Sequence, residues 1–451
     1  MPRVSASADD LPPHIGRYQV LKRLGEGATS DVFLARDPFQ GVDVAIKRMR
    51  AWAPPVDAPG SDFGSRFFSA EAALAGRLHH PNVVAILDAV ANPNEGEAPY
   101  LVMEYVPGVT LKHFCRSDRL LPLDQIVELG FKCAMALGYV YRQGVIHRDV
   151  KPANLLAVLD LAGQVVDVKV SDFGSALNLH ADATQIHRVG SLAYMPPEQI
   201  EGGDVDGRAD IYALGAVLYH LIGGRPPFDA PHQMALMHQI YHQPPLPLTG
   251  QRQGVTAALD AVVLRALAKS PQERYADWDS FAQALSALVA SQQVPLNRLG
   301  EVRDSERFNL LRSLEFFSDF GDVQLWEVAR RARWKRYPAG YALFKRGQEG
   351  NSFHIIAQGE VEVFREGRMV ATLGQGTSVG EMAYLAPNPD LRRHSTDIKV
   401  SQECTTISFT PESLGQLSPE CQHRFDRGFI RVLVRRLHAA HEALAHPRRI
   451  L

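Results

Sequence analysis

Two short polar stretches carry most of the information in this chain: His147-Arg148-Asp149-Val150-Lys151-Pro152-Ala153-Asn154 and Asp172-Phe173-Gly174. Taken separately, each is compatible with an ordinary polar loop. Three features precede them in chain order: the glycine cluster Gly25-Glu26-Gly27, Lys47 at the end of the apolar run Val44-Ala45-Ile46, and Glu71. Glycines let backbone N–H groups approach phosphate oxygens, and a lysine after an apolar run needs a fixed anion nearby. Together, in this order, they indicate a site that handles phosphate.

The set resembles the protein kinase family over roughly residues 17–290, and its Ser/Thr branch because Lys151 follows Asp149 by two positions. Further matching pieces are His80-Pro81-Asn82, Tyr194-Met195-Pro196-Pro197-Glu198, Asp210-Ile211-Tyr212-Ala213-Leu214-Gly215 and Arg274. The resemblance implies an α+β fold with two lobes, the first β-rich and the second α-rich. It also implies ATP and Mg²⁺ as cofactors and a protein Ser or Thr hydroxyl as substrate.

The resemblance assigns a role to each catalytic residue. Lys47 holds the α- and β-phosphates while Glu71 fixes its ammonium group. Asp172 and Asn154 are the Mg²⁺ ligands, in keeping with the preference of this hard cation for oxygen. Asp149 accepts the proton of the incoming hydroxyl. Lys151 neutralises charge on the phosphoryl group in transfer.

The nucleotide and one structural ion pair are assigned in the same way. The resemblance places Gly25, Glu26 and Gly27 over the nucleotide and uses Glu104 to Val106 as the hinge that meets adenine, after the gatekeeper Met103. The other residues that it assigns to this part of the chain are Val32 and Ala45 in the nucleotide site and the structural ion pair of Glu198 with Arg274.

The sequence departs from the kinase pattern at two positions. Ser30 stands at the third glycine of the loop, and Pro196 replaces the usual alanine before Pro197-Glu198. Serine is small and Pro196 touches no catalytic atom, so neither change indicates an inactive enzyme. The alternative is a pseudokinase that serves as a signalling scaffold, but such proteins usually lack one of the residues Lys47, Asp149 and Asp172, all present here.

Arg148 precedes Asp149, and kinases of this kind often use that arginine to receive a phosphorylated residue of the activation loop. The loop extends from Asp172 to Glu198. Thr184 is the candidate phosphosite, with an unmodified threonine as the alternative, and Ser191 is expected near the substrate hydroxyl.

Residues 309–450 resemble the cyclic nucleotide-binding domain family, a β-roll flanked by helices. The residues that carry the resemblance are Tyr337-Pro338-Ala339-Gly340, Gly359-Glu360-Val361-Glu362-Val363, and Leu373 to Ala383 with Gly380-Glu381-Met382-Ala383 at its end. The resemblance implies cAMP or cGMP as a candidate ligand, with Glu381 accepting from the ribose 2′-OH and the backbone at Gly380 close to the nucleotide.

The arginine that pairs with the cyclic phosphate is harder to place. Counting back from the strand Thr405–Phe409 puts His394 at its position, and Arg393 is one residue away. A slip of one residue in a strand turns a side chain to the other face. Arg393 therefore contacts the phosphate only if the irregular stretch Ala386–Leu391 re-aims it, and Asp397 adds a negative charge nearby. The alternative is a roll that binds a protein partner.

Composition limits the remaining possibilities. The chain has 451 residues, 45% of them hydrophobic, and a formal net charge of −2, so neither a disordered chain nor a nucleic-acid-binding protein is indicated. The four cysteines form no C-x-x-C pair, and no segment is long and apolar enough to span a membrane, which favours a cytoplasmic protein. The predicted organisation is a disordered tail 1–15, a kinase domain 16–290, a linker 291–308 and the cyclic nucleotide-binding-like domain 309–451. Because the two domains are fused, we expect the second to regulate the first.

Overall fold

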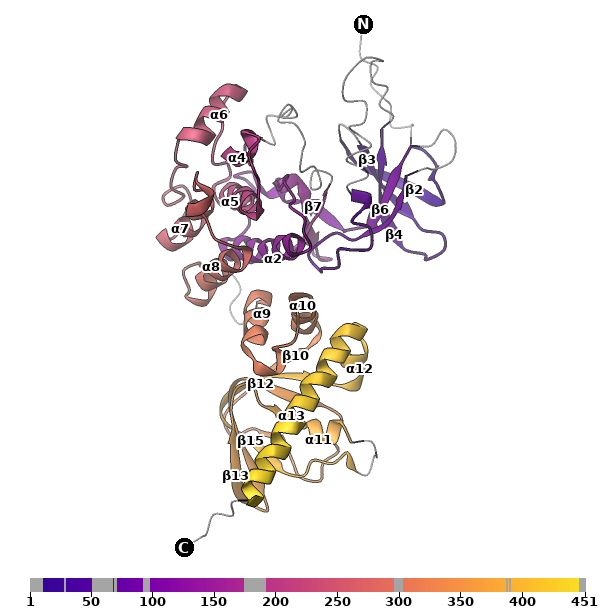
Figure 1. The fold of residues 1–451 in the computed structure, drawn as a ribbon, viewed down its shortest axis with the longest axis vertical. Coiled ribbons are helices and arrows are strands. Elements are labelled where there is room, and N and C mark those ends of the chain that lie inside the picture. Colours follow the sequence, from indigo (N-terminus) through magenta and orange to yellow (C-terminus); the bar gives the residue numbers. More distant parts are fainter. Residues whose placement is uncertain are drawn as a thin grey trace. The chain divides into compact units, whose positions relative to one another are not determined.

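The computed structural model describes residues 11–27, 30–50, 68, 71–91, 98–173, 192–295, 303–386, 388 and 391–445. It divides into two compact units, Met1–Glu301 and Val302–Leu451 (Figure 1). Several predicted features lie outside the described residues: the Pro/Gly loop at 51–65, Gly174, the candidate phosphosite Thr184, and Ser191.

The first unit begins with a six-stranded antiparallel sheet, as the alternating pattern of residues 17–50 predicts. In spatial order its strands are β1 (His14–Ile15), β2 (Tyr18–Glu26), β3 (Ser30–Arg36), β4 (Asp43–Met49), β6 (Tyr100–Glu104) and β5 (Ile86–Val90). The apolar pattern of Val83–Val90 predicts a longer strand than β5, but Val83 forms only an isolated bridge with Val170.

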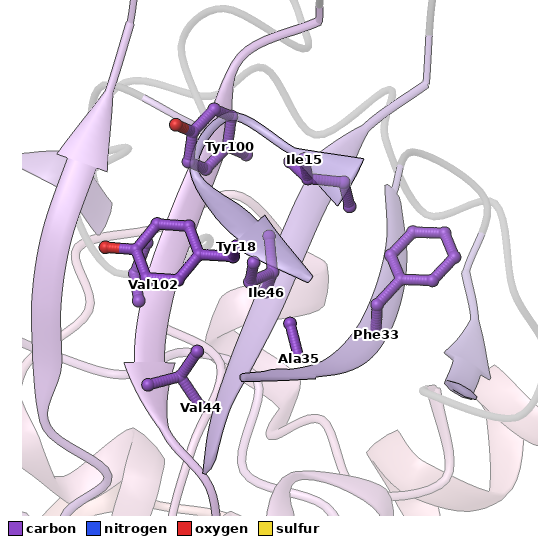
Figure 2. Packing of buried hydrophobic residues seen from close by; sticks show 8 residues of the cluster. All are labelled: Ile15, Tyr18, Phe33, Ala35, Val44, Ile46, Tyr100 and Val102. Carbon is purple, nitrogen blue, oxygen red and sulfur yellow. The ribbon is translucent and has the colours of Figure 1, made fainter. Parts of the chain in front are cut away.

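One face of this sheet carries the core of the lobe (Figure 2). The cluster consists of Ile15, Tyr18, Phe33, Ala35, Val44, Ile46, Tyr100 and Val102. Its members on β3, β4 and β6 are spaced two residues apart, as a single strand face requires. Lys47 falls out of phase with Val44 and Ile46 and is thereby directed to the opposite face of the sheet, together with Ala45.

The rest of the first unit is mainly helical. Its helices are α2 (Leu123–Arg142), α4 (Pro197–Ile200), α5 (Gly207–Gly223), α6 (Gln233–His242), α7 (Ala257–Ala266) and α8 (Trp278–Ala290), with 3-10 turns at Leu111–Phe114, Pro152–Asn154 and Pro271–Glu273. Helix α5 is buried along nearly its whole length, as its apolar sequence predicts.

A three-stranded sheet accompanies the helices, with its first strand before α2 and its other two strands between α2 and α4. It consists of β7 (Gly108–Thr110), β8 (Leu155–Leu159) and β9 (Val165–Val170). The spacing of apolar residues after Leu123 predicts mainly helices, but β8 and β9 are short apolar runs, and such runs are ambiguous between strand and buried helix. The sheet matters for function because Asn154 directly precedes β8 and Asp172 follows the end of β9.

The predicted ends of the domains differ from the structure in two places. Residues His14 and Ile15, expected in a disordered tail, form β1 by pairing with β2. The expected linker 291–308 overlaps helix α9, which begins at Asp304. Ser305 and Phe308 are buried in that helix, so its first turns belong to the second unit.

The second unit is a β-roll with helices before, within and after it. Its helical elements are α9 (Asp304–Ser313), a 3-10 turn at Glu315–Phe317, α10 (Asp322–Arg331), α11 (Glu381–Tyr384), α12 (Pro411–Gly415) and α13 (Pro419–Ala445). Its strands are β10 (Arg333–Tyr337), β11 (Ala342–Phe344), β12 (Phe353–Arg365), β13 (Arg368–Leu373), β14 (Ser378–Val379) and β15 (Asp397–Phe409). The long strands β12 and β15 pair along most of their length and form the centre of the sheet.

Helix α13 closes the described part of the chain and packs through an aromatic face. The rings of Phe425 and Phe429 lie 4.8 Å from Phe409 and 4.7 Å from Phe353, centroid to centroid. Such edge-to-face contacts add to the free energy gained from burial. No helix among the described residues has the length and apolar character needed to cross a bilayer.

Candidate active site

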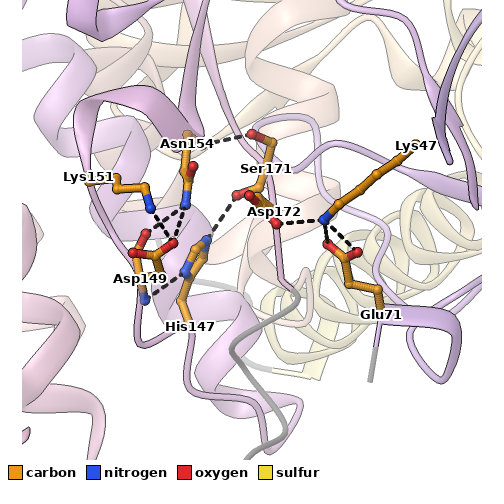
Figure 3. Close-up of polar contacts among 8 residues, drawn as sticks. All are labelled: Lys47, Glu71, His147, Asp149, Lys151, Asn154, Ser171 and Asp172. Atoms are coloured by element: carbon orange, nitrogen blue, oxygen red, sulfur yellow. Dashed lines mark hydrogen bonds and ion pairs between the residues drawn. The ribbon is translucent and has the colours of Figure 1, made fainter. Parts of the chain in front are cut away.

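Lys47, Glu71 and Asp172 meet in the first unit (Figure 3). The Nζ atom of Lys47 lies 2.7 and 2.9 Å from the two carboxylate oxygens of Glu71 and 2.8 Å from Oδ1 of Asp172. The side chains of Lys47 and Glu71 are 14% and 3% exposed. The predicted pairing of these two residues is confirmed, and β4, the segment around Glu71 and the end of β9 converge on one ammonium group.

The three charges stabilise one another in a partly buried setting. Burial disfavours the charged form of Lys47, but the carboxylates of Asp172 and Glu71 outweigh it and raise the lysine pKa. Burial also opposes ionisation of Asp172, yet the adjacent Lys47 lowers its pKa well below the usual range. Burial raises the pKa of Glu71, and Lys47 offsets part of this effect. Near neutral pH the site therefore holds an ammonium beside the anionic Asp172.

Asp149 lies at the centre of a second group of contacts. Its Oδ2 atom accepts hydrogen bonds from Nζ of Lys151 at 2.6 Å and from Nδ2 of Asn154 at 3.0 Å. Asn154 also donates to the backbone carbonyl of Asp149 at 2.8 Å. Because both side-chain donors converge on Oδ2, Oδ1 is left as the oxygen available to a substrate hydroxyl. The side-chain nitrogen of Asn154 faces Asp149. The side-chain oxygen of Asn154 therefore points away from Asp149, as a metal ligand requires.

Asp210 on α5 holds the backbone of this loop, a role that the sequence did not reveal. Its buried carboxylate accepts from the backbone N–H groups of His147 at 2.7 Å and Arg148 at 2.8 Å. Arg148 has a positive φ of 63°, which costs free energy in a residue with a side chain. Gln199 donates to the carbonyl of Arg148 at 2.8 Å. These bonds stabilise the strained loop in the form that presents Asp149.

His147 connects the two groups of contacts. Its Nδ1 atom lies 3.3 Å from the backbone nitrogen of Asp149, and Nε2 lies 3.0 Å from the carbonyl oxygen of Ser171. The ring of Phe173 packs on it with centroids 4.9 Å apart. Asp172, between Ser171 and Phe173, also has a positive φ of 67°. The histidine thus fixes the spacing between the loop of Asp149 and the segment that carries Asp172.

The expected nucleotide-binding glycines lie where the end of β2 meets the start of β3. Gly25 in β2 pairs with Val32 in β3, and the N–H of Gly27 donates to the carbonyl of Ser30 at 2.8 Å. The intervening residues 28–29 are outside the described part of the chain. Ala45 pairs with Met103 across β4 and β6.

The expected hinge follows β6 at Glu104. The backbone N–H of Glu104 donates to the carbonyl oxygen of Ala85 at 2.9 Å. The carboxylate of Glu104 lies 2.9 Å from Nζ of Lys169 in β9. Glu104 therefore connects the expected hinge to the segment of Ala85 and to β9. The contact of the hinge with adenine stays a prediction.

The predicted structural ion pair is confirmed. The guanidinium of Arg274 binds both carboxylate oxygens of Glu198 at 2.6 and 2.8 Å, and Arg274 is only 2% exposed. Its remaining donors reach the carbonyls of Ala268, Arg208 and Lys269. A bidentate pair of this kind fixes α4 to the segment after α7.

In the second unit, the expected nucleotide site is built around the start of α11. Gly380 has a φ of 84°, and a Cβ there would lie 3.0 Å from the ring of Phe344, so glycine is required. Met382 is exposed and Ala383 is buried. Glu381 is buried and forms an ion pair with Arg436 of α13, which also donates to the carbonyl of Ser378 at 2.7 Å. Burial raises the pKa of Glu381, and Arg436 opposes that rise.

The arginine expected at a cyclic phosphate is turned to the protein instead. Arg393 is exposed, and its Nη1 atom donates to the carbonyl of Gly347 at 2.9 Å. His394, at the register position of that arginine, is buried and stacks on Phe344 with ring centroids 4.0 Å apart. Burial lowers the pKa of His394, which disfavours the cationic form. In this arrangement Arg393 is bound to Gly347, and the cation paired with Glu381 is Arg436.

Comparison with protein families now places the chain. Residues 18–287, more than half of the chain, match the protein kinase domain. The chain belongs to the protein kinase family. Residues 334–420 match the cyclic nucleotide-binding domain, so the β-roll of the second unit corresponds to that domain.

Three similar curated kinases, all from mycobacteria, illustrate the match. The serine/threonine-protein kinase PknB of Mycobacterium leprae is 40% identical over 270 residues, which are 58% of this chain and 42% of that protein. PknB of Mycobacterium tuberculosis H37Rv is 37% identical over 309 residues, or 67% of this chain and 47% of that protein. PknB of Mycolicibacterium smegmatis is 40% identical over 271 residues, covering 58% of this chain and 42% of the relative. The alignment with each of these kinases spans less than half of the relative's length.

Kinase chemistry requires that the lysine–glutamate pair and the metal-binding aspartate be in place at the same time. In this structure Lys47 contacts Glu71 and Asp172 at the same time. The metal and the nucleotide fit this donor set, because Asp172 and Asn154 offer oxygen ligands and Lys47 offers a fixed cation.

Proposed function

We propose that the protein is an active serine/threonine kinase that transfers the γ-phosphate of ATP to a protein hydroxyl and to itself. The observation that carries the proposal is the simultaneous pairing of Lys47 with Glu71 and Asp172. The 37–40% identity to kinases named as serine/threonine-specific supports the substrate class.

The residues of the first unit divide the work of phosphoryl transfer. Lys47 binds the α- and β-phosphates, and Glu71 keeps its ammonium in position. Asp172 and Asn154 hold Mg²⁺, which bridges phosphate oxygens and neutralises developing charge. Asp149 accepts the hydroxyl proton through Oδ1, while Lys151, already 2.6 Å from Oδ2, stabilises charge on the phosphoryl group.

Lys47→Met tests this proposal against the scaffold alternative. The substitution removes the phosphate-binding cation but keeps a flexible side chain of similar length. ADP production with Mg²⁺ and a generic Ser/Thr protein substrate should fall by at least a hundredfold. The variant also loses stability, because Glu71 and Asp172 lose their cation, so circular dichroism must show that it is folded at the assay temperature. Turnover that is absent from the wild type and from Lys47→Met alike would favour the scaffold.

For the second unit, a cyclic nucleotide is the ligand class to which the domain match points. We propose that cAMP or cGMP binds at the start of α11 only by displacing Arg436 from Glu381. The ion pair with Arg436 already occupies the carboxylate that would accept from the ribose 2′-OH. Arg393 would have to leave Gly347 to meet the phosphate. If it does, Arg393→Ala should weaken binding by about 10- to 100-fold, the value of one charge-assisted hydrogen bond. If calorimetric titration shows no binding of either nucleotide at millimolar concentration, the proposal of a cyclic-nucleotide site is refuted. The kinase proposal is not affected by that result.

We also propose that the second unit regulates the first, an inference that rests on their fusion in one chain. Autophosphorylation of the full chain and of a chain ending at residue 300 should then differ in rate. Equal rates, with and without cAMP or cGMP, would favour the alternative in which the roll binds a protein partner. A cytoplasmic location is part of the proposal, because all four cysteines are free and buried.

A further inference from the structure

Helix α6 carries two histidines on the side that faces away from the protein. Its buried residues are Leu236 and Ile240, four positions apart. An α-helix turns by about 100° per residue, so the position two residues after each of them lies on the opposite side. His238 and His242 occupy these two positions, and both are exposed. Because α6 lies at the edge of the helical region, this side of the helix is open to a ligand (Figure 1).

The two imidazole rings are close enough to share one metal ion. Residues four apart are neighbours on a helix surface, and the ring centroids of His238 and His242 lie 4.9 Å apart. A metal that binds one nitrogen of each ring at about 2.0–2.1 Å, with about 90–109° between the bonds, places the centroids about 4.5–5.2 Å apart. The observed separation lies within that range. The rings are also tilted by 60° and not stacked, so a nitrogen of each can turn toward one point.

The ligand type determines the class of ion. Imidazole is a preferred ligand of Cu²⁺, Ni²⁺ and Zn²⁺, whereas Mg²⁺ prefers oxygen. In the part of the chain that the structure describes, no group of three or more His, Cys, Asp or Glu side chains is placed to hold a metal ion. The two imidazoles therefore supply two ligands, and water occupies the remaining positions of the ion.

We propose that His238 and His242 bind one Cu²⁺ or Ni²⁺ ion on the exposed side of α6. Of the two ions, Cu²⁺ binds more tightly, as is general for nitrogen ligands. The site is separate from the expected Mg²⁺ site, where Asp172 and Asn154 offer oxygen ligands. Structural zinc sites use four protein ligands, whereas this site has two, so we expect dissociation constants in the micromolar range.

Isothermal titration with Ni²⁺ tests the site. Millimolar Mg²⁺ in the buffer keeps oxygen sites occupied by the hard cation. His438 and His441 are also exposed, three residues apart on α13, so the full chain first receives His438→Ala and His441→Ala to remove that second candidate pair. This background chain should bind one equivalent of Ni²⁺.

Single substitutions in the background chain then locate the bound ion. His238→Ala and His242→Ala should each weaken Ni²⁺ binding at least tenfold. His423→Ala is the matched control, because His423 is exposed on α13 and has no histidine three or four residues away. Binding that is absent at millimolar Ni²⁺ overturns the proposal, as does binding that His423→Ala weakens as much as His238→Ala does. Circular dichroism of every variant confirms that the helices remain folded.

Electron paramagnetic resonance of the Cu²⁺-loaded background chain tests the ligand set. The spectrum should show coupling to nitrogen from two imidazoles, and His242→Ala should reduce it to coupling from one. Coupling from a single imidazole before any change at α6 would contradict a site shared by the two histidines, even if the ion is bound.

Discussion

The Glu71→Gln substitution probes the ion pair on which the kinase proposal rests. Lys47 and Glu71 are joined by two contacts at 2.7 and 2.9 Å, and both side chains are largely withdrawn from water. The amide keeps the shape and one hydrogen-bond acceptor but removes the charge that balances the ammonium. Lys47 then pairs with Asp172 alone, and in the active complex Asp172 is also required by Mg²⁺.

The size of the effect follows from the loss of a preorganised charge. Removing one such electrostatic contact from an active site typically lowers the rate by about 100- to 1,000-fold. Since Asp172 remains beside Lys47 and glutamine keeps a hydrogen bond, we expect the low end, roughly a hundredfold in kcat/KM for ATP.

The assay is steady-state ADP release at varied ATP and saturating Mg²⁺, on wild type, Glu71→Gln and Asp43→Asn. Asp43 is the matched control, because its carboxylate pairs with Arg36 at 2.7 Å in the same sheet, but both side chains are more than a third exposed. An exposed pair is worth less than ~1 kcal/mol, so kcat/KM should change less than about fivefold. Retention of wild-type kcat/KM within threefold in Glu71→Gln would refute the reasoning about the site.

Three further predictions concern stability. Arg274→Ala leaves Glu198 without its bidentate partner and should lower the free energy of unfolding by about 3–5 kcal/mol, seen in chemical denaturation; an unchanged midpoint would show that the pair is dispensable. Burial lowers the pKa of His354 to about 4 from 6.5, so the unfolded chain binds more protons between these values. The stability of the roll should therefore be complete above pH 6.5 and fall by roughly 3 kcal/mol as the pH drops to 4, and His354→Gln should flatten this slope in thermal melts. Arg436→Ala leaves the buried carboxylate of Glu381 unpaired and should destabilise the roll by about 3 kcal/mol at pH 7 and by less at lower pH, where the carboxyl becomes neutral; equal losses at both values would contradict the ion-pair account.

The contacts among the expected catalytic residues could be predicted from the sequence because those residues lie in short local patterns. Asp149, Lys151 and Asn154 are joined within one loop of a few residues, and the structure shows them in contact. Lys47 and Glu71 could be paired because a lysine after an apolar strand needs an anion, and a single candidate followed on the next segment.

Contacts between distant segments were beyond the reach of local patterns. Asp210 reaches His147 across 63 positions, and Arg436 reaches Glu381 across 55 positions. Nothing in the spacing of these residues distinguishes a buried ion pair from a solvated charge. The sequence leaves the strand register at His394 open, and only the packing on Phe344 shows where that side chain lies.

The most direct test of the central claim is incubation of the full chain with radiolabelled ATP and Mg²⁺, in wild type and Asp149→Asn, followed by phosphoamino-acid analysis. Asparagine keeps the shape of Asp149 and can still contact Lys151, but it cannot accept the hydroxyl proton. The account predicts label on serine or threonine of the wild type and at least a hundredfold less on the variant. Equal labelling of the two proteins, or no labelling of the wild type, would contradict it.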